Sequence, residues 1–112
     1  MQHKDKIVLQ KICSELNFAI NFLESVSLEE FLENEVMKRV IGMTSINIGE
    51  LVKNLDIEFR QQYPEVAWKD AAKFRDVVAH KYESLNFKDI YKTVIEDFPK
   101  MKKQVEKILE TE

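Results

Sequence analysis

The sequence predicts an all-α protein, most simply an up-and-down four-helix bundle with one short extra helical turn. The chain of 112 residues has only two glycines and two prolines, which is too few for the many turns of a sheet-rich fold. Apolar residues recur at helical spacing along most of the chain. With 45% hydrophobic and 33% charged residues, residues 1–112 are expected to fold as a single helical domain.

The first helix is predicted over about residues 4 to 24, because apolar side chains there follow the i, i+3, i+4 rule. This stripe consists of Leu9, Ile12, Leu16, Ala19, Ile20 and Leu23. Cys13 lies beside the stripe, and we interpret it as packed against the core rather than as a reactive thiol. Because it is the only cysteine, an internal disulfide and a cysteine-rich zinc site are excluded.

Two capping signals follow the first helix. Ser27, with Glu30 three residues later, has the spacing of a capping box and predicts a short helical turn. Asn34 can cap the start of a second long helix, expected over about residues 35 to 62. The apolar face of that helix is predicted to include Val36, Val40, Met43, Leu51, Leu55 and Phe59.

Both glycines of the chain, Gly42 and Gly49, fall inside the predicted second helix. A glycine in a helix interior costs about 1 kcal/mol relative to alanine. Seven residues make nearly two turns, so the two glycines lie on almost the same side. A close approach of another helix would explain them, either within the core or at a dimer seam.

Proline and asparagine mark the remaining boundaries. Pro64 disfavours a helical conformation at the residue before it, so the chain should turn there. A third helix is predicted from about Val66 to Lys81. Asn86 should cap a fourth helix over about residues 87 to 110, and Pro99 should kink or divide that helix.

Net charge limits the classes of partner. The formal net charge is −3 and the sequence pI is about 5.5, so no overall basic field attracts nucleic acid. If RNA is bound, the attraction must come from a local patch or from a surface built by oligomerisation. The start of the chain does not resemble a signal peptide, and no apolar run approaches the roughly 20 residues that span a bilayer. We therefore expect a soluble cytoplasmic protein.

Arg75 is the unusual residue of the predicted third helix, because it points into the middle of a broad apolar arc. Burying an unpaired guanidinium would be very costly. Two explanations remain open at this point. Arg75 either forms an ion pair with an acid on another helix, for which Glu50 is the candidate, or lines a cleft or subunit interface and binds an anion.

His80 and Asp76 lie one turn apart on the polar side of the same helix. At this spacing the carboxylate can orient the imidazole, although ordinary exposed pairs have the same spacing. The only other histidine is His3, close to the start of the chain, and no second ligand has a metal-binding spacing. We expect neither a metal site nor another cofactor.

Arg75 and His80 are separated by about 140° on an ideal helix. One regular helix therefore does not aim both at the same phosphate. They converge either if the helix loosens near Ala79 or if two subunits pool their residues. Cleavage of RNA through its 2′-hydroxyl needs a base and an acid, and a symmetric dimer would supply two copies of the histidine.

Together, Arg75, His80 and Tyr82 form an Arg-x4-His-x-Tyr signature that resembles the HEPN superfamily, specifically the HepT-like toxins of HepT/MNT toxin–antitoxin systems. The similarity extends over roughly residues 5 to 108. Further matching positions are Ile48-Gly49-Glu50, Pro64, Trp68 and Phe98-Pro99. Taken without the resemblance, Tyr82 would be an aromatic that closes the end of the core, with its hydroxyl in water.

The resemblance implies a helical bundle that dimerises and brings its arginine and histidine motifs together in an interface cleft. Active members are metal-independent endoribonucleases. On this sequence, Arg75 would stabilise charge on the scissile phosphate and His80 would serve as acid and base, with Asp76 orienting it. Lys69, Lys73 and Lys81 are candidate phosphate contacts.

The resemblance also implies a partner. In related systems the antitoxin is a minimal nucleotidyltransferase, which transfers AMP from ATP to the motif tyrosine, here Tyr82. The attached AMP would block RNA by bulk and negative charge. Asp76 stands where this family often has asparagine, and Glu83 stands where an apolar or aromatic residue is common.

Two other functions compete with the toxin hypothesis. The chain could be a non-catalytic substrate-binding or regulatory subunit of a minimal nucleotidyltransferase, with Arg75 holding nucleotide or pairing with Glu50. It could also be a structural dimerisation domain in which Arg75 forms only an ion pair. Ribonuclease activity and nucleotide binding distinguish these readings.

Overall fold

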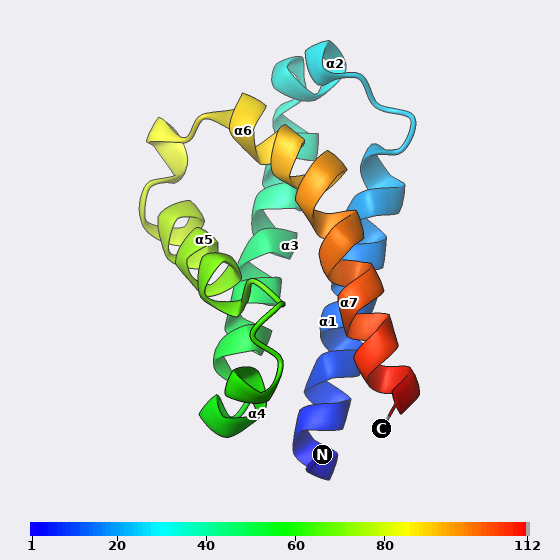
Figure 1. The fold of residues 1–112 in the computed structure, drawn as a ribbon. Coiled ribbons are helices and arrows are strands. Elements are labelled where there is room, and N and C mark those ends of the chain that lie inside the picture. Colours follow the sequence, from blue (N-terminus) through cyan, green and yellow to red (C-terminus); the bar gives the residue numbers. More distant parts are fainter. Residues whose placement is uncertain (112) are drawn as a thin grey trace.

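The computed structural model describes residues 1–111, which form helices joined by short turns, without a strand among them. The predicted all-α class is confirmed. The long helices are α1 (His3–Leu23), α3 (Glu35–Lys53), α5 (Trp68–His80) and α7 (Phe98–Thr111), shown in Figure 1. The short ones are α2 (Leu28–Glu33), α4 (Ile57–Gln62) and α6 (Phe87–Lys92). No helix in the described part of the chain is long and apolar enough to cross a membrane.

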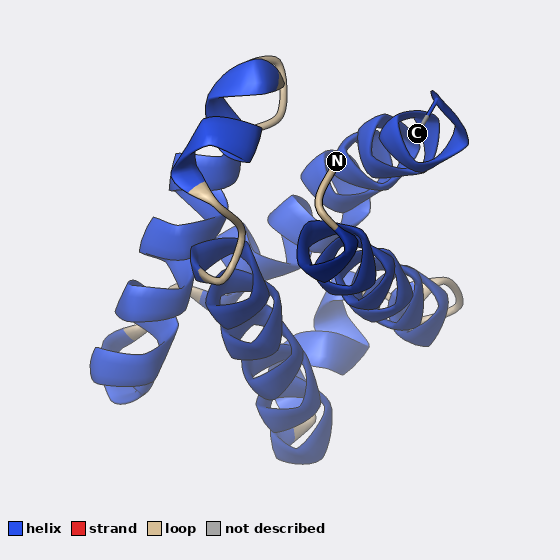
Figure 2. Ribbon diagram, turned by 90° about the horizontal axis from the view of Figure 1, so that it is seen from below, coloured by secondary structure: helices blue, strands red, loops and turns tan. Residues whose placement is uncertain are grey.

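The long helices are arranged in the order α7, α1, α3, α5 across the bundle (Figure 2). α1 packs between α7 and α3, and α5 packs on the other side of α3. The predicted first-helix stripe is confirmed, since Leu9, Ile12, Leu16, Ala19 and Leu23 are buried and Ile20 is partly buried against the same core. α5, which carries Arg75 and His80 of the motif, therefore rests chiefly on α3 at one edge of the bundle.

Cys13 is half-buried against this core. Burial, reinforced by the nearby carboxylate of Glu106, raises the pKa of the Cys13 thiol. Little of the reactive thiolate is therefore present at neutral pH. The interpretation of Cys13 as a packing residue agrees with this environment.

Two apolar residues of α3 do not lie where the sequence predicts. Val36 and Met43 are exposed, with 70% and 59% of their surface accessible. Among the helices that the structure describes, α3 packs chiefly on the long helices α1 and α5, and its apolar arc is wider than these two helices cover. The prediction that Val36 and Met43 face the core was therefore wrong for a single subunit.

The predicted helix starts are confirmed by side-chain caps. Ser27 Oγ accepts a hydrogen bond from the backbone N–H of Glu30 at 3.1 Å, and Asn34 Oδ1 accepts one from Met37 at 3.0 Å. Asn86 Oδ1 accepts from the first turn of α6. Each cap satisfies backbone donors that have no partner inside the helix.

The single helix predicted over residues 35 to 62 is wrong, because the chain breaks into α3 and α4. α3 ends at Lys53, and α4 begins at Ile57. At the break, the backbone N–H of Asp56 donates to Oδ1 of Asp5 at 3.1 Å. Asp5 is a fully buried residue of α1, so a distant carboxylate replaces the helical hydrogen bond that is lost.

The third and fourth predicted helices agree with the structure except near their ends. α5 begins at Trp68 and stops at His80, so Lys81 lies outside it, and Tyr82–Ser84 form a 3₁₀ turn. The fourth helix is divided before Pro99, as predicted. A π-helical turn, Thr93–Asp97, separates α6 from α7. Proline lacks an N–H and its ring collides with the carbonyl four residues earlier, which a widened turn accommodates.

Candidate active site

Gly49 brings α5 directly against α3. A Cβ added at Gly49 would lie 2.8 Å from Cγ of Arg75 and 2.9 Å from the backbone oxygen of Ala71, and closer still to Cβ of Arg75. Gly42 faces the end of α5 and the turn after it, where a Cβ would lie 3.7 Å from Cγ1 of Val78 and 3.3 Å from Cε1 of Tyr82. Of the two explanations for the glycines, the structure shows a close helix approach inside one chain.

This approach places Arg75 beside Glu50, as the ion-pair prediction required. Arg75 Nε lies 2.5 Å from Oε1 of Glu50. Nε is buried and has no partner in hydrogen-bond geometry in the described part of the chain, so the contact is an ion pair without a well-aligned hydrogen bond. The Arg75 side chain remains 24% exposed, which leaves the guanidinium at the surface of the α3–α5 seam.

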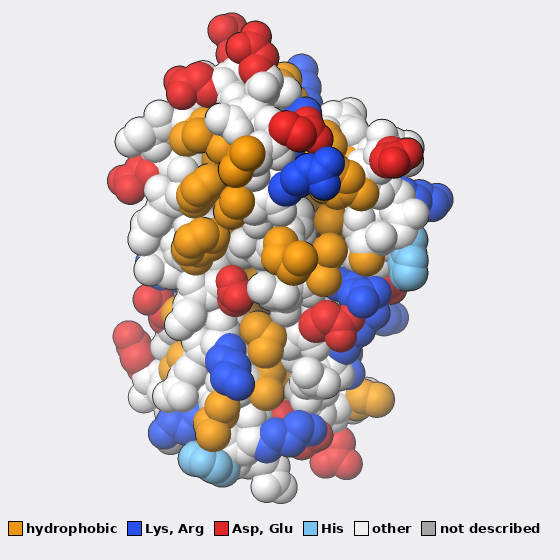
Figure 3. Space-filling model, turned by 180° about the vertical axis from the view of Figure 1, so that it is seen from behind, with side chains coloured by type: hydrophobic (Ala, Val, Ile, Leu, Met, Phe, Trp, Pro, Cys, Tyr) orange, Lys and Arg blue, Asp and Glu red, His pale blue; other side chains and the backbone are white. Residues whose placement is uncertain are grey.

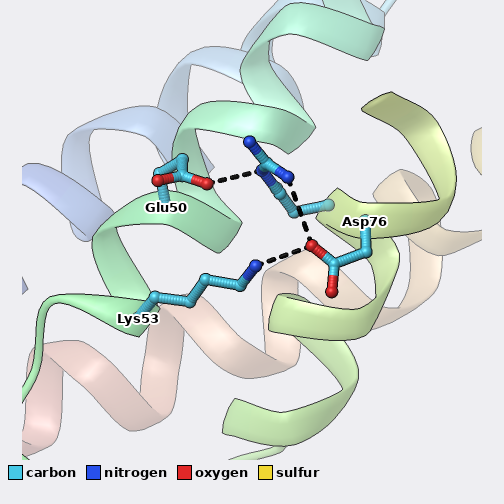
Figure 4. Close-up of polar contacts among 4 residues, drawn as sticks. Glu50, Lys53 and Asp76 are labelled. Atoms are coloured by element: carbon cyan, nitrogen blue, oxygen red, sulfur yellow. Dashed lines mark hydrogen bonds and ion pairs between the residues drawn. The ribbon is translucent and has the colours of Figure 1, made fainter. Parts of the chain in front are cut away.

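The other edge of the guanidinium faces Asp76. Nη1 of Arg75 donates to Oδ1 of Asp76 at 3.3 Å, so the guanidinium lies between two carboxylates (Figure 4). Within residues 1–111, Nη2 donates no hydrogen bond. Arginine can therefore be held in place by Glu50 and Asp76 while it still offers an N–H to an incoming phosphate.

Asp76 has a second partner, Lys53, at the end of α3. Lys53 Nζ donates to the same Oδ1 of Asp76 at 2.6 Å (Figure 4). The hydrogen bond from Lys53, followed by that from Arg75, lowers the pKa of the Asp76 carboxyl below its ordinary value. In the described residues no hydrogen bond or ion pair joins Asp76 to His80. The orientation of His80 by Asp76 stays a prediction.

His80 is the last residue of α5, and its side chain is exposed. It makes no hydrogen bond or ion pair with any residue that the structure describes. α5 is α-helical through Ala79, so the alternative of a loosened turn at that residue was wrong. The other alternative, that two subunits pool their residues, stays a prediction.

Three lysines lie near His80 in the sequence, two on α5 and one directly after it. Lys69, Lys73 and Lys81 are exposed, and none of them has an ion-pair partner within residues 1–111. Spacings of four and seven residues place Lys69, Lys73 and His80 along one stripe of α5. The contact of these three lysines with phosphate stays a prediction.

Tyr82 lies in the 3₁₀ turn after α5, and its ring is packed rather than free. The ring meets Phe87 edge-on with centroids 5.4 Å apart, and Cζ of Arg39 lies 5.4 Å from the Tyr82 centroid. The Tyr82 hydroxyl is enclosed and has no hydrogen-bond partner among residues 1–111. The expectation that this hydroxyl lies in water was therefore wrong.

These residues lie within the part of the chain that matches a known family. A family model described as "Ribonuclease HepT-like" matches residues 12–108. The chain belongs to the HepT-like ribonuclease family. This confirms both the resemblance seen in the sequence and the expected class of enzyme, a ribonuclease.

Several curated proteins resemble this HepT-like chain along almost its whole length. "Putative RNase TTE0752" of Caldanaerobacter subterraneus subsp. tengcongensis is 36% identical over 104 residues, 93% of each chain. "Putative RNase MJ1380" of Methanocaldococcus jannaschii is 32% identical over 90% of this chain and 93% of its own. "Probable ribonuclease HepT" of Thermococcus cleftensis is 31% identical over 96% and 98%, respectively. No solved structure gives a significant match.

Two residues of this HepT-like site were not found by sequence reasoning. Lys53 contacts Asp76, and Arg39 lies over Tyr82. Each is three residues from a position on α3 that faces α5, Lys53 from Glu50 and Arg39 from Gly42. Helical spacing would have indicated them once the pairing of α3 with α5 was known.

Proposed function

We propose that this protein is the toxin of a HepT/MNT-type toxin–antitoxin pair and acts in the cytoplasm as a metal-independent endoribonuclease. The observation that carries the proposal is the placement of Arg75. It is held between two carboxylates on the helix that ends at the exposed His80, and its Nη2 donates to none of the described residues 1–111. Membership of a ribonuclease family supports RNA as the substrate.

The proposed reaction transfers the phosphoryl group within the RNA. The 2′-oxygen forms a bond to phosphorus while the bond to the 5′-oxygen breaks. His80 accepts the proton of the 2′-hydroxyl, and the partner subunit's His80 donates a proton to the departing 5′-oxygen. Arg75 stabilises the negative charge that develops on the phosphate oxygens, and Lys69, Lys73 and Lys81 contact neighbouring phosphates.

Purified protein should cut single-stranded RNA in the presence of EDTA. The products should carry 2′,3′-cyclic phosphate and 5′-hydroxyl ends, which mass spectrometry of the fragments identifies. Cleavage that depends on added Mg²⁺, or that leaves other ends, would contradict the metal-independent mechanism. An absence of cleavage by the dimer would contradict the ribonuclease proposal itself.

The two subunits of the proposed homodimer meet through an apolar face of α1 and α3. Phe18, Val36 and Met43 are exposed there and line a shallow hollow with little polar surface. Figure 3, which shows this side of the molecule, has hydrophobic side chains gathered beside charged ones. A second hollow continues from Phe18 to Glu50, the partner of Arg75. Joining two such faces would bury apolar surface and place both motif helices beside the seam.

Glutamate at Met43 should separate the proposed dimer, because a carboxylate cannot be buried there without a partner. Met43→Glu is expected to elute as a monomer on size exclusion with light scattering and to lose cleavage. Ile57→Glu is the matched control, since Ile57 is equally exposed but lies on α4, outside this face. A Met43→Glu protein that remains dimeric would place the interface elsewhere.

The proposed antitoxin, a minimal nucleotidyltransferase, joins the α-phosphorus of ATP to the Tyr82 oxygen and releases pyrophosphate. The ring of Tyr82 has to leave its packing against Phe87 so that the enclosed hydroxyl becomes accessible for this transfer. Co-expression with such an enzyme should add AMP-sized masses to the wild-type chain and none to Tyr82→Phe. Tyr91→Phe is the control, because the Tyr91 hydroxyl donates to the backbone oxygen of Val26 and lies outside the motif. This variant should gain as much AMP as the wild type. AMP-sized masses on Tyr82→Phe would move the modification to another residue.

A second candidate function is a non-catalytic substrate-binding or regulatory subunit of a minimal nucleotidyltransferase. The observation that favours it is the ion pairing of Arg75 with both Glu50 and Asp76, which is also what a structural or nucleotide-holding arginine would show. Nucleotide binding without RNA cleavage would select this candidate. A double-mutant cycle at Arg75 and Glu50 measures how much of the role is structural.

A further inference from the structure

Asp76 presents an electrostatic problem to the proposed active site. Its carboxylate is next to Arg75, where an RNA phosphate has to approach. An ionised carboxylate repels that phosphate and also competes with it for the N–H groups of the guanidinium. The site therefore needs something that offsets the charge of Asp76 without removing Arg75 from its place.

Lys53 meets this need in the structure. Its ammonium donates to Oδ1 of Asp76 at 2.6 Å, which is shorter than the 3.3 Å contact from Arg75 to the same oxygen. The stronger partner of the carboxylate is thus the lysine rather than the arginine. We propose that Lys53 is a positioning residue that neutralises Asp76 and keeps Arg75 available to the RNA phosphate, an inference that rests on the ribonuclease function proposed above.

The backbone explains why Lys53 can take this position. Glu50 and Lys53 are three residues apart on α3, so both project from the face that packs on α5. Together with Arg75 and Asp76 they form a row of alternating charge across the α3–α5 seam, which Figure 4 shows. The four formal charges cancel. Loss of Lys53 leaves the row with one excess negative charge facing the substrate.

A direct contact between Lys53 and RNA is the competing explanation, and it predicts a different mutant pattern. If Lys53 bound phosphate itself, its loss would weaken the enzyme whatever residue occupied position 76. If Lys53 acts by neutralising Asp76, the defect should disappear when Asp76 is replaced by its neutral isostere. Lys53→Met, which keeps the length of the side chain, and Asp76→Asn therefore separate the two explanations in a double-mutant cycle.

The experiment compares kcat/KM for RNA cleavage among wild type, Lys53→Met, Asp76→Asn and the double variant at low salt. Lys53→Met should lower kcat/KM about fivefold, as expected for one uncompensated charge near the substrate. The kcat/KM of the double variant should be within about twofold of that of Asp76→Asn. Such a result requires that the effects of the two substitutions are coupled. Additive effects, or no effect of Lys53→Met in an active enzyme, would overturn the role of Lys53. Lys103→Met on α7, far along the chain from the motif, controls for loss of a surface charge.

Two further readouts separate this inference from the proposed function. NMR titration of the Asp76 carboxyl should show that Lys53→Met raises its pKa toward the ordinary value, because the Lys53 hydrogen bond is the largest cause of its lowering. Anisotropy with labelled single-stranded RNA should show the same rescue pattern in binding affinity. If wild type binds RNA without cutting it, the ribonuclease proposal fails while this rescue pattern still decides the role of Lys53.

Discussion

Alanine at His80 is expected to lower the rate of RNA cleavage by a factor of about 10² to 10⁴, the usual contribution of a general acid–base group. Arg75→Ala should lower it by about 10² to 10³, because the charge developing on the phosphate loses its nearest donor. Both rates are measured under single-turnover conditions with excess dimer, so that product release does not limit them.

The two variants differ in what they do to the fold. His80 is exposed at the end of α5 and has no bonded partner within residues 1–111, so His80→Ala should melt at the wild-type temperature. Arg75→Ala leaves Glu50 unpaired, but the Glu50 side chain is about half exposed and can be solvated. Undiminished cleavage in both well-folded variants would contradict their proposed roles.

Gly49→Ala is expected to have the largest effect on stability. The added methyl group would lie 2.8 Å from Cγ of Arg75 and 2.9 Å from the backbone oxygen of Ala71, and neither the start of a side chain nor backbone can move aside cheaply. α5 has to shift away from α3, at a cost of about 3 kcal/mol or more after the better helix propensity of alanine is counted. The melting temperature should fall by more than about 10 °C.

Gly42→Ala is the matched control for this prediction. It makes the same chemical change on the same helix, two turns away and facing the same neighbour. There the new methyl group would lie 3.3 Å from Cε1 of Tyr82, a ring in a short turn that can shift by a few tenths of an ångström. Its stability should change by less than about 1 kcal/mol. Equal losses in both variants would show that Gly49 is not the tight contact.

Local signals predicted much of the fold. Ser27, Asn34 and Asn86 cap helices as their spacing indicated, and the stripe of α1 is buried. The break between α3 and α4 was not predictable in the same way. It depends on Asp5, 51 residues earlier in the chain, whose carboxylate accepts from the N–H of Asp56. The residues around position 56 give no sign of Asp5, which becomes a hydrogen-bond partner only when the helices pack together.

The contacts of the candidate site were predictable only in part. Glu50 could be named as a candidate partner because an arginine on an apolar arc requires a counter-charge, but the sequence left an anion-binding role for Arg75 equally open. For Asp76, helical spacing favoured His80, but Lys53 of another helix is its partner in the structure. Likewise, Val36 and Met43 follow an apolar period that gives no indication of whether the covering surface belongs to the same chain.

The enclosed hydroxyl of Tyr82 has a kinetic consequence. A group without solvent access reacts only in those molecules whose turn has opened, so its reactivity is scaled by the fraction that is open. An enzyme that modifies Tyr82 would therefore react in proportion to the open fraction while it is dilute, and at saturating concentration its rate could not exceed the rate at which the turn opens. Beyond saturation, more of the modifying enzyme would not make the reaction faster.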